Sequence, residues 1–274
     1  MRSAPLPLDE EARLAALAEY DALHDGLDPR LDEIVHLARR LFEVPIALVS
    51  LVDRNRQVFA ARSGLEACET GREESFCAHA LGGDELLVVR DALLDPRFSN
   101  NPLVVGPPFI RFYAGAPLRS ASGYDLGTLC IIDTRPHSSM SARDRHSLRD
   151  LAQLVVDQLE LRRIDLAGQV GQRRFESIAA TSPDGIICAD ENGRITFWND
   201  TASALFGHSR QEAVGENVAI LVPEGVPGDA GEHGLARIAH GDVPPGLGKS
   251  AELQVRHRSG RIFPVEVALS MWKD

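Results

Sequence analysis

The hydrophobic pattern of the first forty-five residues predicts two helices. Residues 11–24 are rich in alanine and leucine and predict the first of them. The second begins at Asp28, a helix-capping residue, followed by Pro29 in the first turn. Its apolar residues recur at helical spacing and form a stripe that should face a core: Leu31, Ile34, Val35, Ala38, Leu41 and Phe42. Pro45 ends this helix.

Strand patterns follow. A continuous apolar run predicts a buried strand over residues 46–52, and the alternation after it predicts an antiparallel partner over 56–62. Further strands are predicted over 86–89, 112–118 and 126–132. The segment 95–108 is rich in Pro, Gly and Asn, and an ordered loop is expected there.

A long helix is predicted over residues 141–165, opened by a capping box from Ser141 to Asp144. Its apolar stripe has the spacing of a dimer seam and consists of Leu148, Leu151, Ala152, Val155 and Leu159. We predict a parallel homodimer through this stripe; the alternative is a helix that packs only within its own domain. Gly168 and Gly171 are expected to interrupt the helix and mark a domain boundary, with a short helix over 172–180 after it.

The second part of the chain contains two predicted hairpins. In residues 184–199 two short β-type runs flank the turn Glu191-Asn192-Gly193, and Asn199 is placed to cap a following helix. Residues 251–257 and 262–271 form the second hairpin. The predicted fold class is α+β, with two domains that each consist of an antiparallel sheet flanked by helices.

Composition narrows the function classes. The formal net charge is −11, which disfavours nonspecific binding to nucleic acid. No apolar run reaches the roughly 18 residues of a membrane span, and the first residues lack the apolar core of a signal peptide. The four cysteines are scattered, so neither a disulfide scaffold nor a structural metal site is expected. A cytoplasmic protein without membrane partners is predicted.

The first part of the chain resembles a GAF domain. The resemblance covers nearly all of residues 8–165 and rests on ordered motifs at residues 45–53, 75–80, 91–98, 112–118 and 127–133, among them Ser-Phe-Cys-Ala-His-Ala and Gly-Thr-Leu-Cys-Ile-Ile-Asp. It is similar to the GAF domain that heads many bacterial sensor histidine kinases and diguanylate cyclases. We assign residues 1–167 to this domain, including an N-terminal helix and a C-terminal signalling helix.

Residues 172–274 resemble a PAS domain, through the hairpin at 184–199, the helix after Asn199 and the motif Phe-Pro-Val-Glu at 263–266. The sequence predicts four strands here, whereas the PAS fold has five. We therefore expect a PAS domain that lacks its last strand, in a fragment or truncated gene. A kinase, cyclase or phosphodiesterase module would normally lie downstream.

The resemblance implies a sensory input module that binds a small ligand or partner and relays the signal through inter-domain helices. The chain is not expected to be an enzyme, because no phosphate-binding glycine loop, HExxH motif or nucleophile elbow is present. One alternative is a thiol-dependent free methionine-R-sulfoxide reductase using Cys68 and Cys77. The loop cysteine of those enzymes should fall within residues 101–106, which contain none.

The candidate ligand-binding residues lie in the GAF-like part: Phe76, Cys77, His79, Arg111 and Tyr113. At strand spacing Cys77 and His79 would share a face and line the pocket; the alternative is packing of small residues. Arg111 and Tyr113 could be directed at a small anionic or aromatic ligand, or could be a surface ion pair and a rim aromatic.

A haem-based gas sensor is the other alternative. His233 lies in a segment that resembles the one carrying the proximal haem ligand of oxygen-sensing PAS kinases, and neutral imidazole is a suitable axial ligand. The arginine that contacts oxygen in those sensors is matched here by Ala251. A surface histidine is the competing interpretation, and the sequence does not identify a cofactor.

Overall fold

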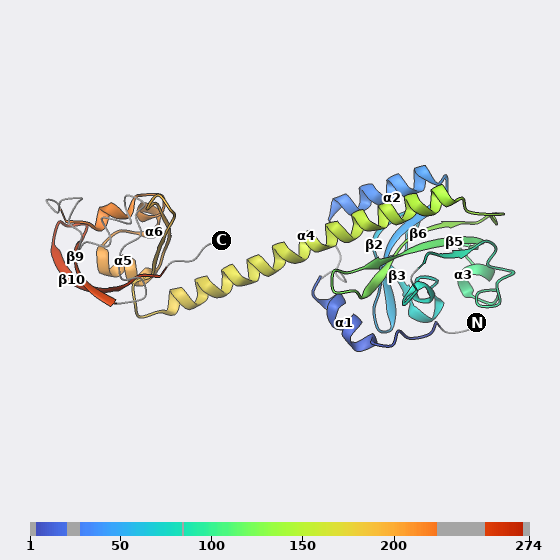
Figure 1. The fold of residues 1–274 in the computed structure, drawn as a ribbon, viewed down its shortest axis with the longest axis horizontal. Helices are drawn as coiled ribbons and strands as arrows, with labels where there is room; N and C mark the ends of the chain where they lie inside the picture. The colour runs from blue at the N-terminus through green and yellow to red at the C-terminus, as the bar shows by residue number, and fades with distance from the viewer. Residues whose placement is uncertain (1–3, 21–27, 84, 224–249, 271–274) are drawn as a thin grey trace. The chain divides into compact units, whose positions relative to one another are not determined.

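The computed structural model describes residues 4–20, 28–83, 85–223 and 250–270. The chain forms two compact units, Met1–Gly168 and Gln169–Asp274 (Figure 1). In the described ranges, none of the helices has the length and apolar character that crossing a bilayer needs.

The first unit is built on one antiparallel sheet with the strand order β3-β2-β1-β6-β5-β4. Its strands are β1 (Ile46–Val52), β2 (Arg56–Ser63), β3 (Glu69–Gly71), β4 (Leu87–Val89), β5 (Phe112–Arg119) and β6 (Asp125–Asp133). The central strand β1 is buried at every position. Gly127 allows β6 to approach it closely, because a Cβ there would lie 1.9 Å from the carbonyl oxygen of Ser50.

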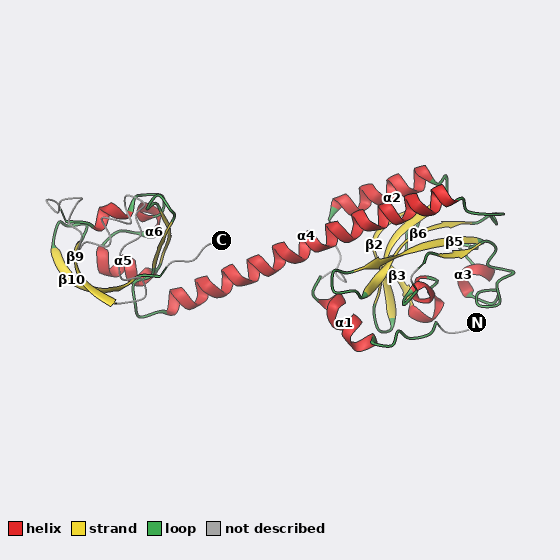
Figure 2. Cartoon of the chain, in the orientation of Figure 1, coloured by secondary structure: helices red, strands yellow, loops and turns green. Residues whose placement is uncertain are grey.

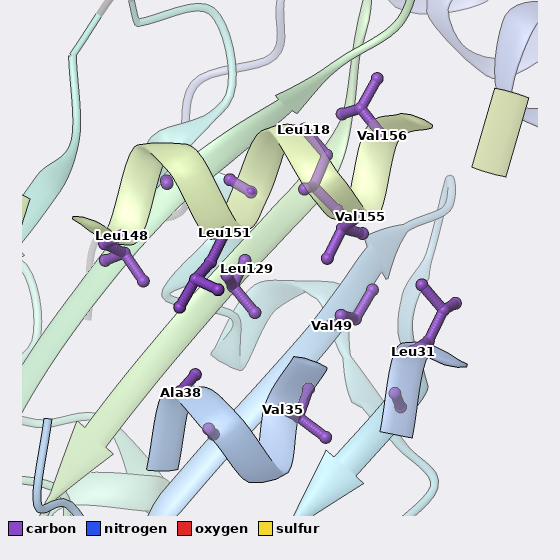
Figure 3. Packing of buried hydrophobic residues seen from close by; sticks show 14 of the residues in the cluster. Leu31, Val35, Ala38, Val49, Leu118, Leu129, Leu148, Leu151, Val155 and Val156 are labelled. Carbon is purple, nitrogen blue, oxygen red and sulfur yellow. The ribbon is translucent and has the colours of Figure 1, made fainter. Parts of the chain in front are cut away.

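Helices cover one face of this sheet. Figure 2 shows α2 (Pro29–Leu41) and α4 (Ala142–Thr181) lying on the same side of the strands. Their apolar side chains meet those of the strands in one core, in which Val35 of α2 and Val155 of α4 are fully buried (Figure 3). The helix α1 (Glu10–Ala18) adds Ala16 and Leu17 to the same core.

The stripe from Leu148 to Leu159 faces the sheet of its own unit. Every member of it is buried in the core, and Val155 is 0 % exposed. The predicted dimer seam along these residues is therefore wrong, and the alternative of a helix packed within its own domain holds for this face. Periodicity identified a buried face but could not say which partner buries it.

The opposite face of the sheet carries short helices and loops. The strand residues on this side alternate with those that face α2 and α4, so that Leu48 and Ser50 of β1 point away from the long helices. The covering segments include the 3₁₀ helices η1 (Arg72–Glu74) and η2 (Cys77–Ala80) and the short helix α3 (Pro102–Val105). The strand β3 and the helix α3 were not predicted, and α3 lies within the expected loop.

Two helix boundaries differ from the prediction. The helix α1 ends at Ala18, whereas the sequence suggested residue 24, and 21–27 lie outside the described residues. The helix α4 continues through Gly168 and Gly171 to Thr181, so the expected interruption is wrong. A glycine costs about 1 kcal/mol relative to alanine in a helix interior, which neighbouring helix-forming residues can offset.

The second unit contains two antiparallel hairpins and short helices. Within its described residues, the elements after α4 are β7 (Ile187–Ala189), β8 (Ile195–Trp198), α5 (Asp200–Phe206), α6 (Arg210–Ala213), η3 (Val218–Leu221), β9 (Ser250–Arg256) and β10 (Ile262–Ala268). Trp198 is fully buried at the centre of the core that joins β8, α5 and β9. The predicted hairpins are confirmed. Ser209 and Glu212 form a capping box at the start of α6.

Candidate functional site

A cavity of about 240 Å³ lies in the first unit, beside the sheet face that the short helices and loops cover. Strands β1, β2, β5 and β6 contribute one wall, and the segments around η2 and α3 contribute the other. The lining residues are Ile46, Leu48, Gln57, Phe59, Leu65, Ala67, Thr70, Phe76, Cys77, Leu103, Pro107, Pro108, Ile110, Tyr113 and Ile132.

The lining is almost entirely apolar. Its polar side-chain atoms come from Gln57, Thr70, Cys77 and Tyr113. Among the lining residues, Cys77 is the one whose side chain can carry a charge near neutral pH, as a thiolate. Burying an unpaired ion costs several kcal/mol or more. The cavity therefore suits an uncharged molecule with few polar groups.

Gln57 is already hydrogen bonded within the protein. Its Oε1 accepts hydrogen bonds from the hydroxyls of Ser50 and Ser75, and its Nε2 donates to Thr70 Oγ1 at 2.6 Å. Ser75 Oγ in turn accepts a hydrogen bond from the backbone amide of Ala78, at 2.9 Å. These bonds fix the start of η2 against β2, and they hold the polar wall of the cavity in place.

Three of the sequence-predicted site residues line the cavity: Phe76, Cys77 and Tyr113. The ring of Phe76 stacks on Phe98, with ring centroids 4.0 Å apart, and its centroid lies 5.2 Å from that of Tyr113. Burial raises the pKa of Tyr113 well above its ordinary value, so its hydroxyl stays protonated. Tyr113 is 0 % exposed and is a wall residue rather than a rim aromatic.

His79 does not line this cavity. The strand assumed for Cys77 and His79 is wrong: both belong to the 3₁₀ helix η2, and residues two apart on a 3₁₀ helix do not share a face. The His79 ring meets Phe98 edge-on, with centroids 4.8 Å apart.

Arg111 also lies outside the cavity lining. Its guanidinium donates two hydrogen bonds to the Asp91 carboxylate, at 2.8 and 2.7 Å. The hydrogen bond from Arg111 holds the pKa of Asp91 below its usual value. Arg111 is thus engaged in the ion pair that the sequence allowed as the alternative, and it is not directed at the cavity.

The sequence pointed to Cys77 but not to its closest polar neighbours. The Cys77 and Cys130 sulfurs lie 3.9 Å apart, and both residues are buried. Burial raises the pKa of the Cys77 thiol, but hydrogen bonds from Cys130, Ser50, Thr128 and Tyr113 outweigh burial and lower it to about 6. The Cys130 pKa lies well above its ordinary value, chiefly because of its hydrogen bond with Cys77 and its burial. Of the two, Cys77 lines the cavity and Cys130 does not.

The haem hypothesis rests on His233, which lies outside the described residues. Ala251 belongs to β9. Across the described part of the chain, no group of three or more His, Cys, Asp or Glu side chains is arranged to hold a metal ion.

Two domain families match the chain in tandem. Residues 26–161 match the GAF domain, and residues 173–272 match the PAS fold. The chain therefore belongs to the proteins that carry a GAF domain followed by a PAS domain. The six-stranded antiparallel sheet with its helices and the two hairpins of the second unit give the α+β class expected for this pair.

The curated relatives include signalling proteins. The chain is 46% identical over 156 residues to a cyclic di-GMP phosphodiesterase of Pseudomonas aeruginosa, covering 57% of this chain and 27% of the relative. It is 28% identical over 137 residues to the sensor protein FixL of Bradyrhizobium diazoefficiens, covering 49% of this chain and 26% of that protein. The chain thus spans about a quarter of these two relatives. GAF and PAS domains with such relatives make it a sensory input module.

Among solved structures, the complex of DhaR(N) and DhaL from E. coli matches 97% of this chain and 87% of the compared chain. The TM-score is 0.53 at 13% sequence identity. This likeness concerns the fold.

Proposed function

We propose that this sensory module detects a small, uncharged and mostly apolar molecule that binds in the GAF cavity. The observation that carries this proposal is the lining itself, with its apolar walls and its few polar side chains. A volume of about 240 Å³ suits a molecule with one or two rings. The ligand would shift the balance between two arrangements of the domain, and the module would perform no turnover of its own.

The same lining argues against a methionine sulfoxide reductase. Free methionine sulfoxide carries an ammonium and a carboxylate, and the cavity offers neither a paired carboxylate nor a guanidinium. The segment where those enzymes place a loop cysteine contains the capping residue Asn101 and the helix α3 instead. The haem sensor finds no further support in the described residues.

Ligand binding can be tested with a matched pair of probes, indole and indole-3-carboxylate. All three tyrosines, Tyr20, Tyr113 and Tyr124, lie in the first unit, and both tryptophans, Trp198 and Trp272, lie in the second. Because indole absorbs in the same range as tyrosine, unfolding is followed by calorimetry, and the transition of the second unit is assigned by tryptophan fluorescence without probe. The remaining transition reports the GAF domain. Indole should raise its unfolding temperature, because a ligand at 100 times its Kd stabilises by about 2.7 kcal/mol. The carboxylate should have no effect.

The control variant fills the cavity. Ile132→Phe places a larger side chain at the wall and should abolish the indole effect, while Ile132→Val should keep it. No stabilisation of the wild type by indole, or equal stabilisation by the anion, would contradict the proposed ligand class.

We also propose that the module acts as a homodimer through a second stripe of α4. Leu154, Leu161 and Ile164 are 51%, 53% and 60% exposed. They follow a heptad pattern, and at 100° per residue they lie on the side of the helix away from Val155. A second copy of the chain, paired along this stripe, would bury these side chains.

The output belongs to the same proposal. Because the cyclic di-GMP phosphodiesterase and FixL are about four times longer than their matched segments, the module would regulate an output domain. The helix α4 begins in the first unit and ends in the second, and it is the element through which we expect a signal to pass. Pure chain should therefore hydrolyse neither cyclic di-GMP nor ATP, and turnover by clean protein would contradict this.

A further inference from the structure

Two cysteines far apart in sequence meet at the wall of the cavity. Cys77 begins η2, and Cys130 lies in β6, which with β1 forms the centre of the sheet. Their sulfur atoms are 3.9 Å apart, and both side chains are buried. Cys68 is exposed and Cys188 lies in the second unit, so the four cysteines comprise one close pair and two single thiols.

Hydroxyl groups surround the sulfur of Cys77. Ser50 and Thr128 are paired in register across β1 and β6, and Thr128 shares a strand face with Cys130 two residues on. The hydroxyls of Ser50, Thr128 and Tyr113 all contribute to lowering the pKa of the Cys77 thiol. Hydroxyl groups near a sulfur stabilise the thiolate more than the thiol, and the thiolate is the form that reacts with oxidants.

Gly115 makes room for one of these donors. It pairs with Cys130 across β5 and β6, and a Cβ there would lie 2.2 Å from the Tyr113 hydroxyl oxygen. The phenol ring of Tyr113 therefore extends over Gly115 of the same strand, and its oxygen lies 3.4 Å from Thr128 Oγ1 of β6. The donor cluster depends on a residue without a side chain at this position.

The cavity gives Cys77 contact with small molecules although the side chain is shielded from bulk solvent. Cys77 is a lining residue, whereas Cys130 lies behind it and is 0 % exposed. A small neutral oxidant that enters the cavity therefore meets Cys77 first. This is the arrangement of a peroxide-reactive cysteine with a resolving partner beside it.

We propose that Cys77 and Cys130 form a reversible dithiol–disulfide pair that is oxidised by hydrogen peroxide or a small organic hydroperoxide. The Cys77 thiolate attacks one peroxide oxygen, the O–O bond breaks, and the departing hydroxide or alkoxide takes up a proton. Cys77 is thereby oxidised to a sulfenic acid. The Cys130 thiol then attacks this sulfur, the S–O bond breaks, and the proton of Cys130 leaves with the hydroxide as water.

With hydrogen peroxide, two thiols and one peroxide give one disulfide and two waters. An external dithiol reverses the step by thiol–disulfide exchange. Disulfide formation requires the sulfurs to approach from 3.9 Å to about 2.05 Å. Because Cys130 is held in the centre of the sheet, η2 would move, and Phe76 of the cavity wall would move with it.

The test uses the full chain with Cys68→Ser and Cys188→Ser, so that only the pair remains. After treatment with hydrogen peroxide and alkylation, intact mass should show loss of two hydrogens and no alkyl groups. A proteolytic digest should yield a peptide that joins Cys77 to Cys130, and dithiothreitol should restore both thiols. Two alkylatable thiols in the folded, peroxide-treated protein would overturn the proposal.

Single variants in that background test the assigned roles. With Cys130→Ala, the sulfenic acid on Cys77 has no resolving thiol and should be trapped by dimedone. With Cys77→Ala, Cys130 should give at least tenfold less dimedone adduct at equal peroxide. Near-UV circular dichroism checks that both variants are folded. Equal labelling of the two would contradict the order of reaction, and a variant that fails to fold is replaced by Cys77→Ser or Cys130→Ser.

Discussion

The side-chain nitrogen of Asn199 donates a hydrogen bond of 2.8 Å to the carbonyl oxygen of Ala179, in the last turn of α4. The same nitrogen donates to the carbonyl of Asp184, and the side-chain oxygen accepts from the amides of Ile186 and Ala202. One buried amide thus joins the end of α4 to the start of the first PAS hairpin and to the first turn of α5. Asn199 thus attaches the last turn of α4 to the PAS domain.

Asn199→Ala should destabilise the PAS domain by about 2–4 kcal/mol, because it removes a helix cap and leaves buried backbone groups without partners. Urea unfolding followed by tryptophan fluorescence measures this, since both tryptophans lie in the second unit. Asn192→Ala, in the exposed hairpin turn, is the matched control and should change stability by less than about 0.5 kcal/mol. Equal effects of the two variants would show that the four hydrogen bonds contribute little.

The two faces of α4 should respond differently to a charge. Leu161→Glu should leave the domain folded and convert a dimer to a monomer, because Leu161 is 53% exposed within one chain. Val155→Glu should unfold the GAF domain, since an unpaired charge in the core costs several kcal/mol. Light scattering and tyrosine circular dichroism separate the outcomes. A wild type that is monomeric at tens of micromolar would contradict the proposed dimer.

Acid should weaken the attachment of α1. Burial raises the pKa of Glu10, but hydrogen bonds and ion pairs with Arg13 and Arg72 outweigh it and lower the pKa from 4.5 to about 2. Because the folded-state pKa is lowered, this stabilisation is complete above pH 4.5 and is lost as the pH falls toward 2. It amounts to roughly 3 kcal/mol at most.

Denaturant unfolding of the GAF domain at several pH values between 7 and 2.5 checks this prediction. Glu10→Gln should flatten the loss of stability across this range. Glu11→Gln is the control, because Glu11 pairs with Arg54 at an exposed site. A Glu10→Gln curve that parallels the wild type would show that the buried pairs do not govern the acid response.

Gly115→Ala should disturb the cavity wall without touching the ligand space directly. The new methyl would displace the Tyr113 hydroxyl, at a cost of about 1–3 kcal/mol. It should also weaken the near-UV tyrosine signal and reduce the rate at which peroxide oxidises Cys77. Gly71→Ala is the control, because a Cβ there meets nothing within 4 Å. An unaltered oxidation rate in Gly115→Ala would show that the Tyr113 hydroxyl is not needed.

Local patterns predicted most of the framework. Strand β1 was predicted with its observed bounds, because an apolar run between Pro45 and a polar turn allows few alternatives. The capping residues Asp28 and Asn199 mark helix starts as expected. The two glycines did not predict that α4 is continuous. Their unfavourable helix propensity can be offset by favourable residues elsewhere in the helix.

The site was less predictable, because it depends on which residues meet through space. Phe76, Cys77 and Tyr113 were found through resemblance and do line the cavity. Cys130 and Ser50 were missed, because their contact with Cys77 arises from the register of β1 against β6 and from the turn of η2. Arg111 was misleading, since Asp91 lies 20 positions away and pairs with it only in the folded chain.

Cys77 belongs both to the cavity wall and to the thiol pair, so ligand binding and thiol oxidation would compete at one residue. A molecule that fills the cavity would shield the sulfur from peroxide, and a disulfide would change the space that the molecule needs. Ligand binding and oxidation would therefore each inhibit the other. A single domain would then respond to an oxidant only while its small-molecule ligand is absent.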